Sequence, residues 1–97
     1  MFKIEGDQDG VVRLAGRLDA AQCPAAQTFL DAVQGVVTLD CSALEYISSA
    51  GLGLLLKTQK RLLAAAGKLR ITGLNAHIRD IFRYSGFDKI FDIEPRA

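Results

Sequence analysis

Residues 36–56 read VVTLDCSALEYISSAGLGLLL, and the pattern of this segment indicates the fold class. It begins with a compact run of β-branched and other apolar residues, which predicts a central strand buried on both faces at 36–39. It then enters a long apolar segment, for which we expect a helix from about Ala50 to Ala66 that Gly67 stops. Strands that are joined through helices of this length pair in parallel. The stretch therefore predicts an α/β domain.

The residues before this stretch predict a hairpin and a first helix. Two β-favouring segments, 2–4 and 11–14, flank a turn whose Asp9-Gly10 pair is a good hairpin signal. The sequence GRLD at 16–19 is expected to end the second of these strands. Pro24 suits the first helical position, and the apolar spacing after it predicts a helix of about ten residues that ends at Gly35.

The residues after this stretch predict one more strand and one more helix. LRIT at 69–72 is expected to form a strand, and Asn75 is expected to cap a helix that stops at Ser85-Gly86. The segment 90–93 adds a short strand or packs as an extended chain. The predicted order is ββαβαβαβ in a single domain, 1–97, with a small mixed β-sheet and packed helices.

The composition describes an ordinary globular domain. The chain has 97 residues, 49% hydrophobic and 24% charged, with a net charge of +1, which argues against a nucleic-acid-coating protein. No apolar run approaches the roughly 20 residues of a membrane span, and the N-terminus lacks a secretory signal, so we expect a cytoplasmic location. Cys23 and Cys41 are expected to be free thiols that act as small buried hydrophobes, and no close Cys/His/Asp cluster indicates a metal or cofactor.

The long helix is expected to have a core face and an outer face. At about 100° per residue, the core face should carry Leu52, Leu55, Leu56, Gln59, Leu62, Leu63 and Ala66. The outer face should carry Gly53, Lys57, Lys60 and Arg61, with Ser49 at its edge, and its cations are typical of a solvated surface. Because a glycine inside a helix costs roughly 1 kcal/mol relative to alanine, Gly53 indicates either close approach of another molecule or simple tolerance.

Ser48 and Ser49 stand where this helix begins. Either serine suits the N-cap position, where its oxygen accepts a hydrogen bond from a free N–H of the first turn. The same position also suits phosphorylation, because a phosphate there meets unpaired N–H groups and the positive end of the helix dipole. Local chemistry leaves both roles open.

Catalysis has little support in the sequence. A nucleophile elbow needs G-x-S-x-G, but Ser49 lies in ISSAG, and the lone His77 has no identifiable acid partner and is expected to be exposed. A phospho-acceptor role for Asp40 would need further acidic residues near the first strand, and the segment 2–4 offers none. We therefore expect a binding module and not an enzyme.

Three segments together resemble the STAS domain family, and most closely the bacterial anti-sigma factor antagonists: GRLDAAQCP at 16–24, LDCSALEYISSAGLGLLL at 39–56 and SGFDKIFDI at 85–93. The resemblance implies that Ser49 is phosphorylated by a partner that is both a serine kinase and an anti-sigma factor. It implies that the unphosphorylated chain binds this kinase and frees the sigma factor, and that a metal-dependent serine phosphatase restores the binding form. Several relatives have Asp directly before the phosphoserine, where this chain has Ser48.

The partner-binding surface is expected around the second serine. Asp19 and Asp40 are expected to accept hydrogen bonds from backbone N–H groups and to shape this surface, with a simple turn cap as the alternative for Asp19. The alternative function is a subunit of a lipid or anion transport complex, or of another signalling complex, without a phosphorylation switch. The expected site residues are Asp19, Asp40, Ser48, Ser49, Gly51, Gly53 and Lys57.

Overall fold

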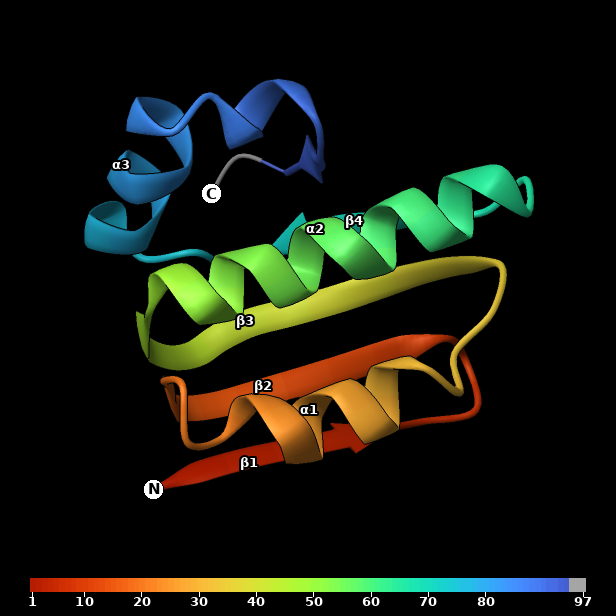
Figure 1. Ribbon diagram of the computed structural model, residues 1–97, viewed down its shortest axis with the longest axis horizontal. Helices are drawn as coiled ribbons and strands as arrows, with labels where there is room; N and C mark the ends of the chain where they lie inside the picture. Colours follow the sequence, from red (N-terminus) through yellow and green to blue (C-terminus); the bar gives the residue numbers. More distant parts are fainter. Residues whose placement is uncertain (95–97) are drawn as a thin grey trace.

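Five strands form one mixed sheet in the order β1-β2-β3-β4-β5 in the computed structural model, which describes residues 1–94 (Figure 1). β1 and β2 are antiparallel, and every other neighbouring pair is parallel. The predicted element order and the mixed sheet are confirmed. The strands are β1 (Phe2–Gly6), β2 (Val11–Leu18), β3 (Val36–Ile47), β4 (Lys68–Thr72) and β5 (Asp92–Ile93).

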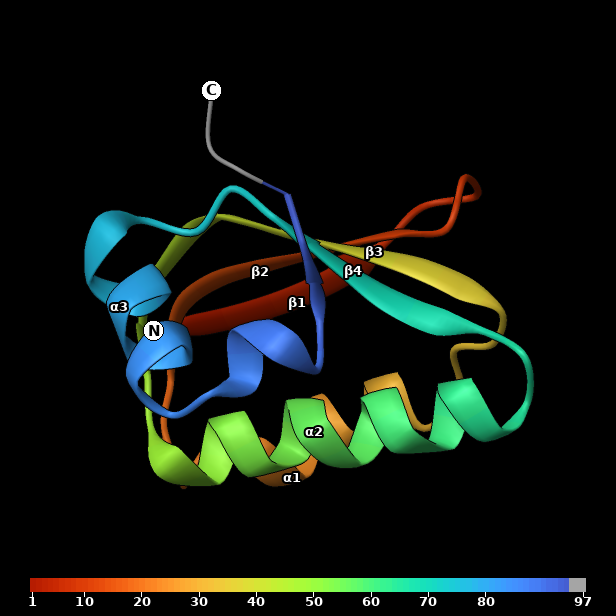
Figure 2. The ribbon, with the colours of Figure 1, turned by 90° about the horizontal axis from the view of Figure 1, so that it is seen from above.

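Three helices and one 3₁₀ turn accompany the sheet. Figure 2 shows α1 and α2 packed against one face of the sheet, and α3 near the end of the sheet where β3 stops. The α1 and α2 helices lie side by side because each one connects two neighbouring parallel strands. The bounds are α1 (Cys23–Leu30), α2 (Ser49–Ala64), α3 (Ala76–Tyr84) and η1 (Phe87–Lys89).

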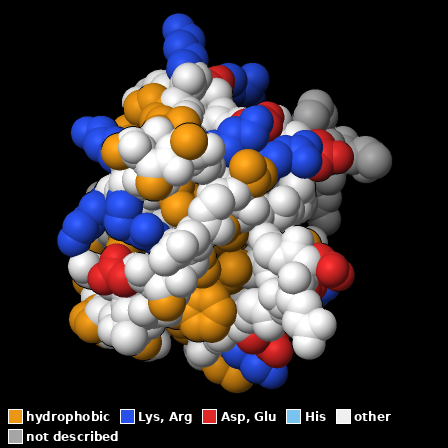
Figure 3. Space-filling model, turned by 90° about the vertical axis from the view of Figure 1, so that its right-hand side faces the viewer, with side chains coloured by type: hydrophobic (Ala, Val, Ile, Leu, Met, Phe, Trp, Pro, Cys, Tyr) orange, Lys and Arg blue, Asp and Glu red, His pale blue; other side chains and the backbone are white. Residues whose placement is uncertain are grey.

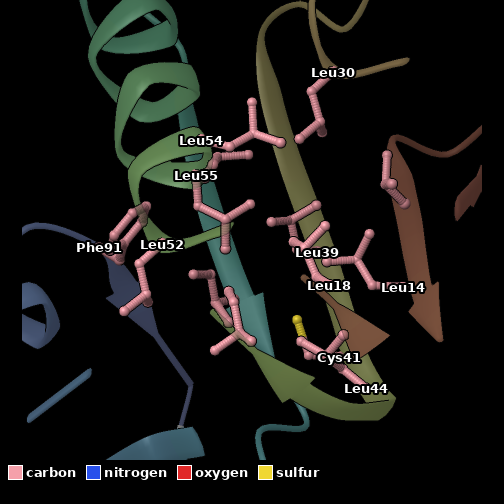
Figure 4. Close-up of a cluster of buried hydrophobic side chains, with 14 of the residues drawn as sticks. Leu14, Leu18, Leu30, Leu39, Cys41, Leu44, Leu52, Leu54, Leu55 and Phe91 are labelled. Carbon is pink, nitrogen blue, oxygen red and sulfur yellow. The ribbon is translucent and has the colours of Figure 1, made fainter. Parts of the chain in front are cut away.

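The core lies between the sheet and the helices α1 and α2 (Figure 4). Leu14 and Leu39 point from the sheet toward Leu55 of α2, and all three are 1% exposed or less. Cys41 is buried in the same layer, and this burial raises the pKa of its thiol to about 12, so the thiol is inert at neutral pH. Cys23 is also a free thiol, but it is only half-buried.

β2 and β3 are longer than the sequence predicted. The segment at 16–19 does not end β2, since Leu18 still pairs with β3, and β3 continues through Asp40 to Ile47. The prediction failed because Gly16 is not a strand breaker here. It has a φ of +86°, and a Cβ at this position would lie 1.9 Å from the carbonyl oxygen of Met1, so the glycine allows β1 to approach.

The paired strands contain two irregularities, which make the part of β3 that pairs with β2 longer by two residues than β2 itself. Arg13 pairs with Asp40, but Ala15 pairs with Ala43, so β3 advances one residue more than β2. A second shift of the same kind follows between Gly16 and Arg17. Each shift is a bulge that adds an unpaired residue to β3. Asp40, which directly follows the predicted strand 36–39, therefore lies inside β3 and not at its carboxyl end.

The helix predictions need two corrections. α1 ends at Leu30, before Gly35. On α2, Leu63 is 52% exposed, whereas Leu54 and Thr58 are buried. The helix ends at Ala64 and not at the predicted Ala66, which lies beyond it and is exposed. The buried face is turned toward α1, where Leu54 lies next to Leu30 (Figure 4). The periodicity of one helix shows that an apolar stripe exists, but a second helix beside it decides which edge of the stripe is covered.

A buried glutamine ties α2 to the C-terminal half of the sheet. Gln59 is 2% exposed, accepts a hydrogen bond from the backbone N–H of Leu69 at 2.7 Å and donates to the carbonyl of Ile90 at 2.9 Å. Its predicted place on the core face is thus confirmed.

Further along the chain, Asn75 caps α3 as predicted, by accepting a hydrogen bond from the N–H of Ile78 at 2.8 Å.

Candidate functional site

The loops that leave β2 and β3 begin side by side. Leu18 pairs with Ile47, and the N–H of Ser48 donates to the carbonyl of Leu18 at 2.9 Å. Because the two strands are parallel, the next residues, Asp19 and Ser48, meet at the same edge of the sheet. The N-termini of α1 and α2 follow at this edge, which is the usual place for function in an α/β sheet.

The two serines have different roles in this loop. Ser48 is the N-cap of α2: its backbone is extended and its Oγ accepts a hydrogen bond from the N–H of Gly51 at 3.2 Å. Ser49 is the first residue of the helix, it is exposed, and its hydroxyl has no hydrogen-bond partner among residues 1–94. The structure thus assigns the cap to Ser48 and leaves the hydroxyl of Ser49 available for chemistry.

Small exposed side chains surround Ser49. The first exposed positions of α1 and of its preceding loop lie at the same edge of the sheet as those of α2, and Lys57 adds a positive charge two turns along α2. A Cβ at Gly53 would have no atom within 4 Å, so the fold does not require glycine there. The exposed small residues are Ala20, Ala21, Pro24, Ala25, Ala50 and Gly53. The result is a surface of low relief.

Gly51 lies beneath this surface and not on it. It is buried, and a Cβ at this position would lie 2.8 Å from Cγ1 of Ile47 and 2.9 Å from the carbonyl oxygen of Leu18. Because a real Cβ does not approach backbone this closely, glycine is required for the first turn of α2 to pack on the ends of β2 and β3. Gly51 therefore positions the serine loop and offers no contact to another molecule.

Asp19 lies beside the serine loop, but its side chain does not cap α1. Gln22 is the residue at the N-cap of α1, and no side chain caps that position. Asp19 closes the turn with its backbone carbonyl, which accepts hydrogen bonds from the N–H of Gln22 and the Sγ of Cys23. Its carboxylate atom Oδ1 is buried and has no partner in the described part of the chain. The expected hydrogen bonds from backbone N–H groups to this side chain are absent there.

Asp40 belongs to a separate cluster. It precedes Ile47 by seven residues of strand, which separates it from the serine loop by roughly 20 Å at about 3.3 Å per residue. Its Oδ1 accepts hydrogen bonds from the N–H of Ser42 at 3.0 Å and from the Ser42 hydroxyl at 2.7 Å. These bonds hold the pKa of Asp40 below its ordinary value, with a smaller contribution from Arg13 at 3.9 Å. Asp40 thus bonds a backbone N–H as predicted, but it shapes a bulge of β3 and not the surface around Ser49.

A stacked pair of side chains at the same edge of the sheet was not predicted from the sequence. Arg17 and Tyr46 are paired across β2 and β3, and the guanidinium carbon lies 4.3 Å from the ring centroid. Each is followed by the last residue of its strand, Leu18 or Ile47, and then by the loop that carries Asp19 or Ser48. The sequence signal that could have identified this pair is the position of each residue directly before the buried last residue of its strand. Because side chains alternate along a strand, Arg17 and Tyr46 lie on the face of the sheet opposite to Leu18 and Ile47.

The opposite end of the domain is hollowed (Figure 3). A cavity of about 450 Å³ lies between the β1–β2 turn and α1, with Phe29 and Val33 among its lining residues. It contributes no residue to the surface around Ser49.

Within residues 1–94, no group of three or more His, Cys, Asp or Glu side chains is arranged to hold a metal ion, and no helix is long and apolar enough to cross a membrane.

Comparisons with known proteins agree on one family. Residues 2–94 match the family model described as Mlab, STAS domain. The chain is 39% identical over 97 residues to the putative anti-sigma factor antagonist BtrV of Bordetella bronchiseptica, which covers 96% of this chain and 82% of BtrV.

Solved structures show the same fold. An anti-sigma factor antagonist from Mycobacterium paratuberculosis superposes with a TM-score of 0.80 and 28% identity, over 100% of this chain and 86% of that one. The Bacillus protein SpoIIAA superposes in its unphosphorylated form with a TM-score of 0.70 at 20% identity, over 100% and 90% of the two chains. Its phosphorylated form gives 0.71 at 21% identity, over 98% and 92%. With its family model, its curated relative and its fold in agreement, the chain belongs to the STAS domain family.

Proposed function

We propose that this chain is an anti-sigma factor antagonist whose binding is switched by phosphorylation of Ser49. In the unphosphorylated state it binds an anti-sigma factor that is also a serine kinase, and the sigma factor is released. The kinase then phosphorylates Ser49 and the complex dissociates, until a serine phosphatase restores the binding form. The chain acts as a binding module in this cycle and not as an enzyme.

The observation that carries the proposal is that Ser48 caps α2, whereas Ser49 does not. Ser48 satisfies a free N–H of α2, while the hydroxyl of Ser49 is exposed and has no partner in residues 1–94. A kinase can therefore modify Ser49 without removing a hydrogen bond on which α2 depends. Modification of Ser48 would remove the cap, which is typically worth about 1 kcal/mol.

The fold is suited to carry the added charge. A phosphate adds about −1.5 to −2 charges at neutral pH, and the N-terminus of a helix offers free N–H groups and the positive end of the dipole to that charge. The unphosphorylated and phosphorylated forms of SpoIIAA both have the fold of this chain. We therefore expect phosphorylation to leave the domain folded.

Binding should respond much more strongly than folding. The exposed residues around Ser49 are small, so a partner can approach the backbone of both helices and exclude water from the hydroxyl. A phosphate in that interface would be desolvated without a matching positive charge, which costs several kcal/mol, whereas 1.4 kcal/mol already weakens binding tenfold.

Calorimetric titration of the kinase with three forms of the chain tests this proposal. The unmodified chain and Ser49→Ala should bind with similar affinity, whereas Ser49→Asp should bind at least about tenfold more weakly because it places a charge in the interface. Circular dichroism should give the same spectrum for all three. Equal affinity of the three forms would contradict the switch, and failure of every form to bind any kinase-type anti-sigma factor would favour the transport or other signalling role.

A further inference from the structure

A second cavity lies in the C-terminal part of the domain, between α3 and β5. Its volume is about 330 Å³, within the range of small-molecule sites. The described residues that line it are Arg79, Arg83, Asp88 and Ile93. None of them belongs to the surface around Ser49, so the chemistry of this cavity is independent of the proposed switch.

Two nitrogen atoms of the Arg79 guanidinium group lack hydrogen-bond partners within residues 1–94. These atoms, Nε and Nη2, are also buried. Leaving a buried donor of a charged group without a partner costs about 1–3 kcal/mol or more, so such groups are rare unless a ligand completes them. Arg79 lines an open cavity, and because the two atoms themselves have almost no exposed surface, a ligand there reaches them when the guanidinium turns toward the cavity.

The two unpaired atoms form a pair with a defined geometry. Nε and Nη2 lie on the same edge of the planar guanidinium, and their N–H groups point in the same direction. This edge matches the two oxygens of a carboxylate, which accepts two parallel hydrogen bonds from it. The unsatisfied edge of Arg79 is therefore the edge that recognises an oxyanion.

The neighbours of Arg79 narrow the ligand class. Arg83 is already paired with Asp80, so Arg79 is the cation in the lining that is left without an acidic partner in the described chain. Asp88 lines the same cavity, and its carboxylate repels a ligand with two negative charges more strongly than a ligand with one. The cavity therefore disfavours a phosphate dianion. Ile93 offers an apolar wall to a short hydrocarbon body.

We propose that the cavity between α3 and β5 binds a small organic monocarboxylate, whose two oxygens accept hydrogen bonds from Nε–H and Nη2–H of Arg79 and whose apolar body contacts Ile93. A bound ligand would connect two elements that are otherwise joined through η1. It stabilises the folded chain, because it binds the folded state and not the unfolded one.

The test is a titration of the ¹⁵N-labelled chain with butyrate, followed by NMR at constant ionic strength, with chloride as the reference anion. The Nε–H resonance of Arg79 and the amide of Ile93 should shift and saturate. Arg79→Lys keeps the charge but loses the paired donors, so the affinity should fall about tenfold or more. Lys89→Gln is the matched control, since it removes an exposed cation that does not line the cavity, and it should leave the affinity unchanged.

Three results would overturn the proposal. The first is the absence of a saturable shift at Arg79 in the unmodified chain. The second is tighter binding of inorganic phosphate than of butyrate, which would assign the cavity to a different anion. The third is a strong coupling between Arg79→Lys and Asp88→Asn in the stability of the ligand-free chain, which would mean that Asp88 already occupies the edge of Arg79 in solution.

Discussion

Two glycines in the first turns of α2 show how differently the same residue type is used in this fold. Gly51 has no room for a Cβ, whereas Gly53 has no atom within 4 Å of one. We expect Gly51→Ala to lower the free energy of unfolding by about 1–3 kcal/mol, because the methyl group would push α2 away from Leu18. Gly53→Ala should raise it by about 1 kcal/mol through helix propensity.

Urea denaturation of both variants checks this pair of predictions. Each variant is the control for the other, since both introduce the same methyl group into the same helix. A neutral Gly51→Ala would mean that the first turn of α2 does not approach β2 as closely as the structure shows. Retained stability together with weaker kinase binding in Gly53→Gln would place Gly53 in the proposed partner surface.

The carboxylate of Asp40 makes the stability of the chain depend on pH. Its pKa is lowered from the ordinary value of 3.8, first by the hydroxyl of Ser42 and next by the N–H of Ser42. A lowered pKa in the folded state means that Asp40 contributes stability above pH 3.8, and that this contribution is lost as the pH falls toward and through the folded-state value. The loss therefore belongs to the acid range and not to neutral pH.

Asp40→Asn provides the measurement. The variant should be less stable than the unmodified chain at neutral pH, and the difference in the free energy of unfolding should shrink as the pH falls below 3.8. In a Ser42→Ala background, the effect of Asp40→Asn on the free energy of unfolding should also be smaller. The Ser42 hydroxyl is the largest cause of the lowered pKa of Asp40, and this substitution removes it. A difference that stays constant down to strongly acid pH would show that Asp40 does not act through its charge.

At the scale of the elements, α1 and α2 are joined by a side chain that the sequence indicated to be solvated. The Nη2 atom of Arg61 donates to the carbonyls of Leu30 and Val33, both at 2.8 Å. The carbonyl of Leu30 belongs to the last turn of α1, where carbonyls lack helical partners, and that of Val33 lies just after the helix. Arg61 therefore stabilises the end of α1, which lacks a basic residue of its own in the last turn.

Arg61→Gln tests this connection between the helices. We expect it to lower the free energy of unfolding by about 1–3 kcal/mol, since two carbonyls lose a charged donor. The amides of the last turn of α1 should also exchange with solvent faster in hydrogen-exchange NMR. Lys60→Gln removes a neighbouring exposed charge and should change stability by less than about 0.5 kcal/mol. Equal effects of the two substitutions would show that charge alone, and not the contact with α1, is responsible.

The sequence predicted the elements well where local chemistry decides them. Asn75 before an apolar helix and the Asp9-Gly10 turn both act through neighbours in the chain, and both predictions are confirmed. The length of β3 depends on pairing with β2, and its two bulges have no local signal. The covered edge of α2 depends on α1, so the exposed position of Leu63 could not be read from periodicity alone.

At the scale of the whole molecule, the order of strands and helices predicted where the candidate site lies. Parallel strands joined by helices bring the loops after β2 and β3 to one edge, so the neighbourhood of Asp19 and Ser48 follows from topology. The distance of Asp40 from this edge does not follow from topology, because it depends on where β3 stops. The sequence left the N-cap open between Ser48 and Ser49, and the geometry of the helix start assigns it to Ser48.

The proposed switch acts on Ser49. Mass spectrometry of the chain after incubation with its kinase and ATP tests this assignment, with Ser48→Ala and Ser49→Ala as paired controls. We predict one phosphate on Ser49 of the unmodified chain, the same phosphate in Ser48→Ala, and none in Ser49→Ala. A phosphate on Ser48 or on another residue, with Ser49 unmodified, would contradict the account.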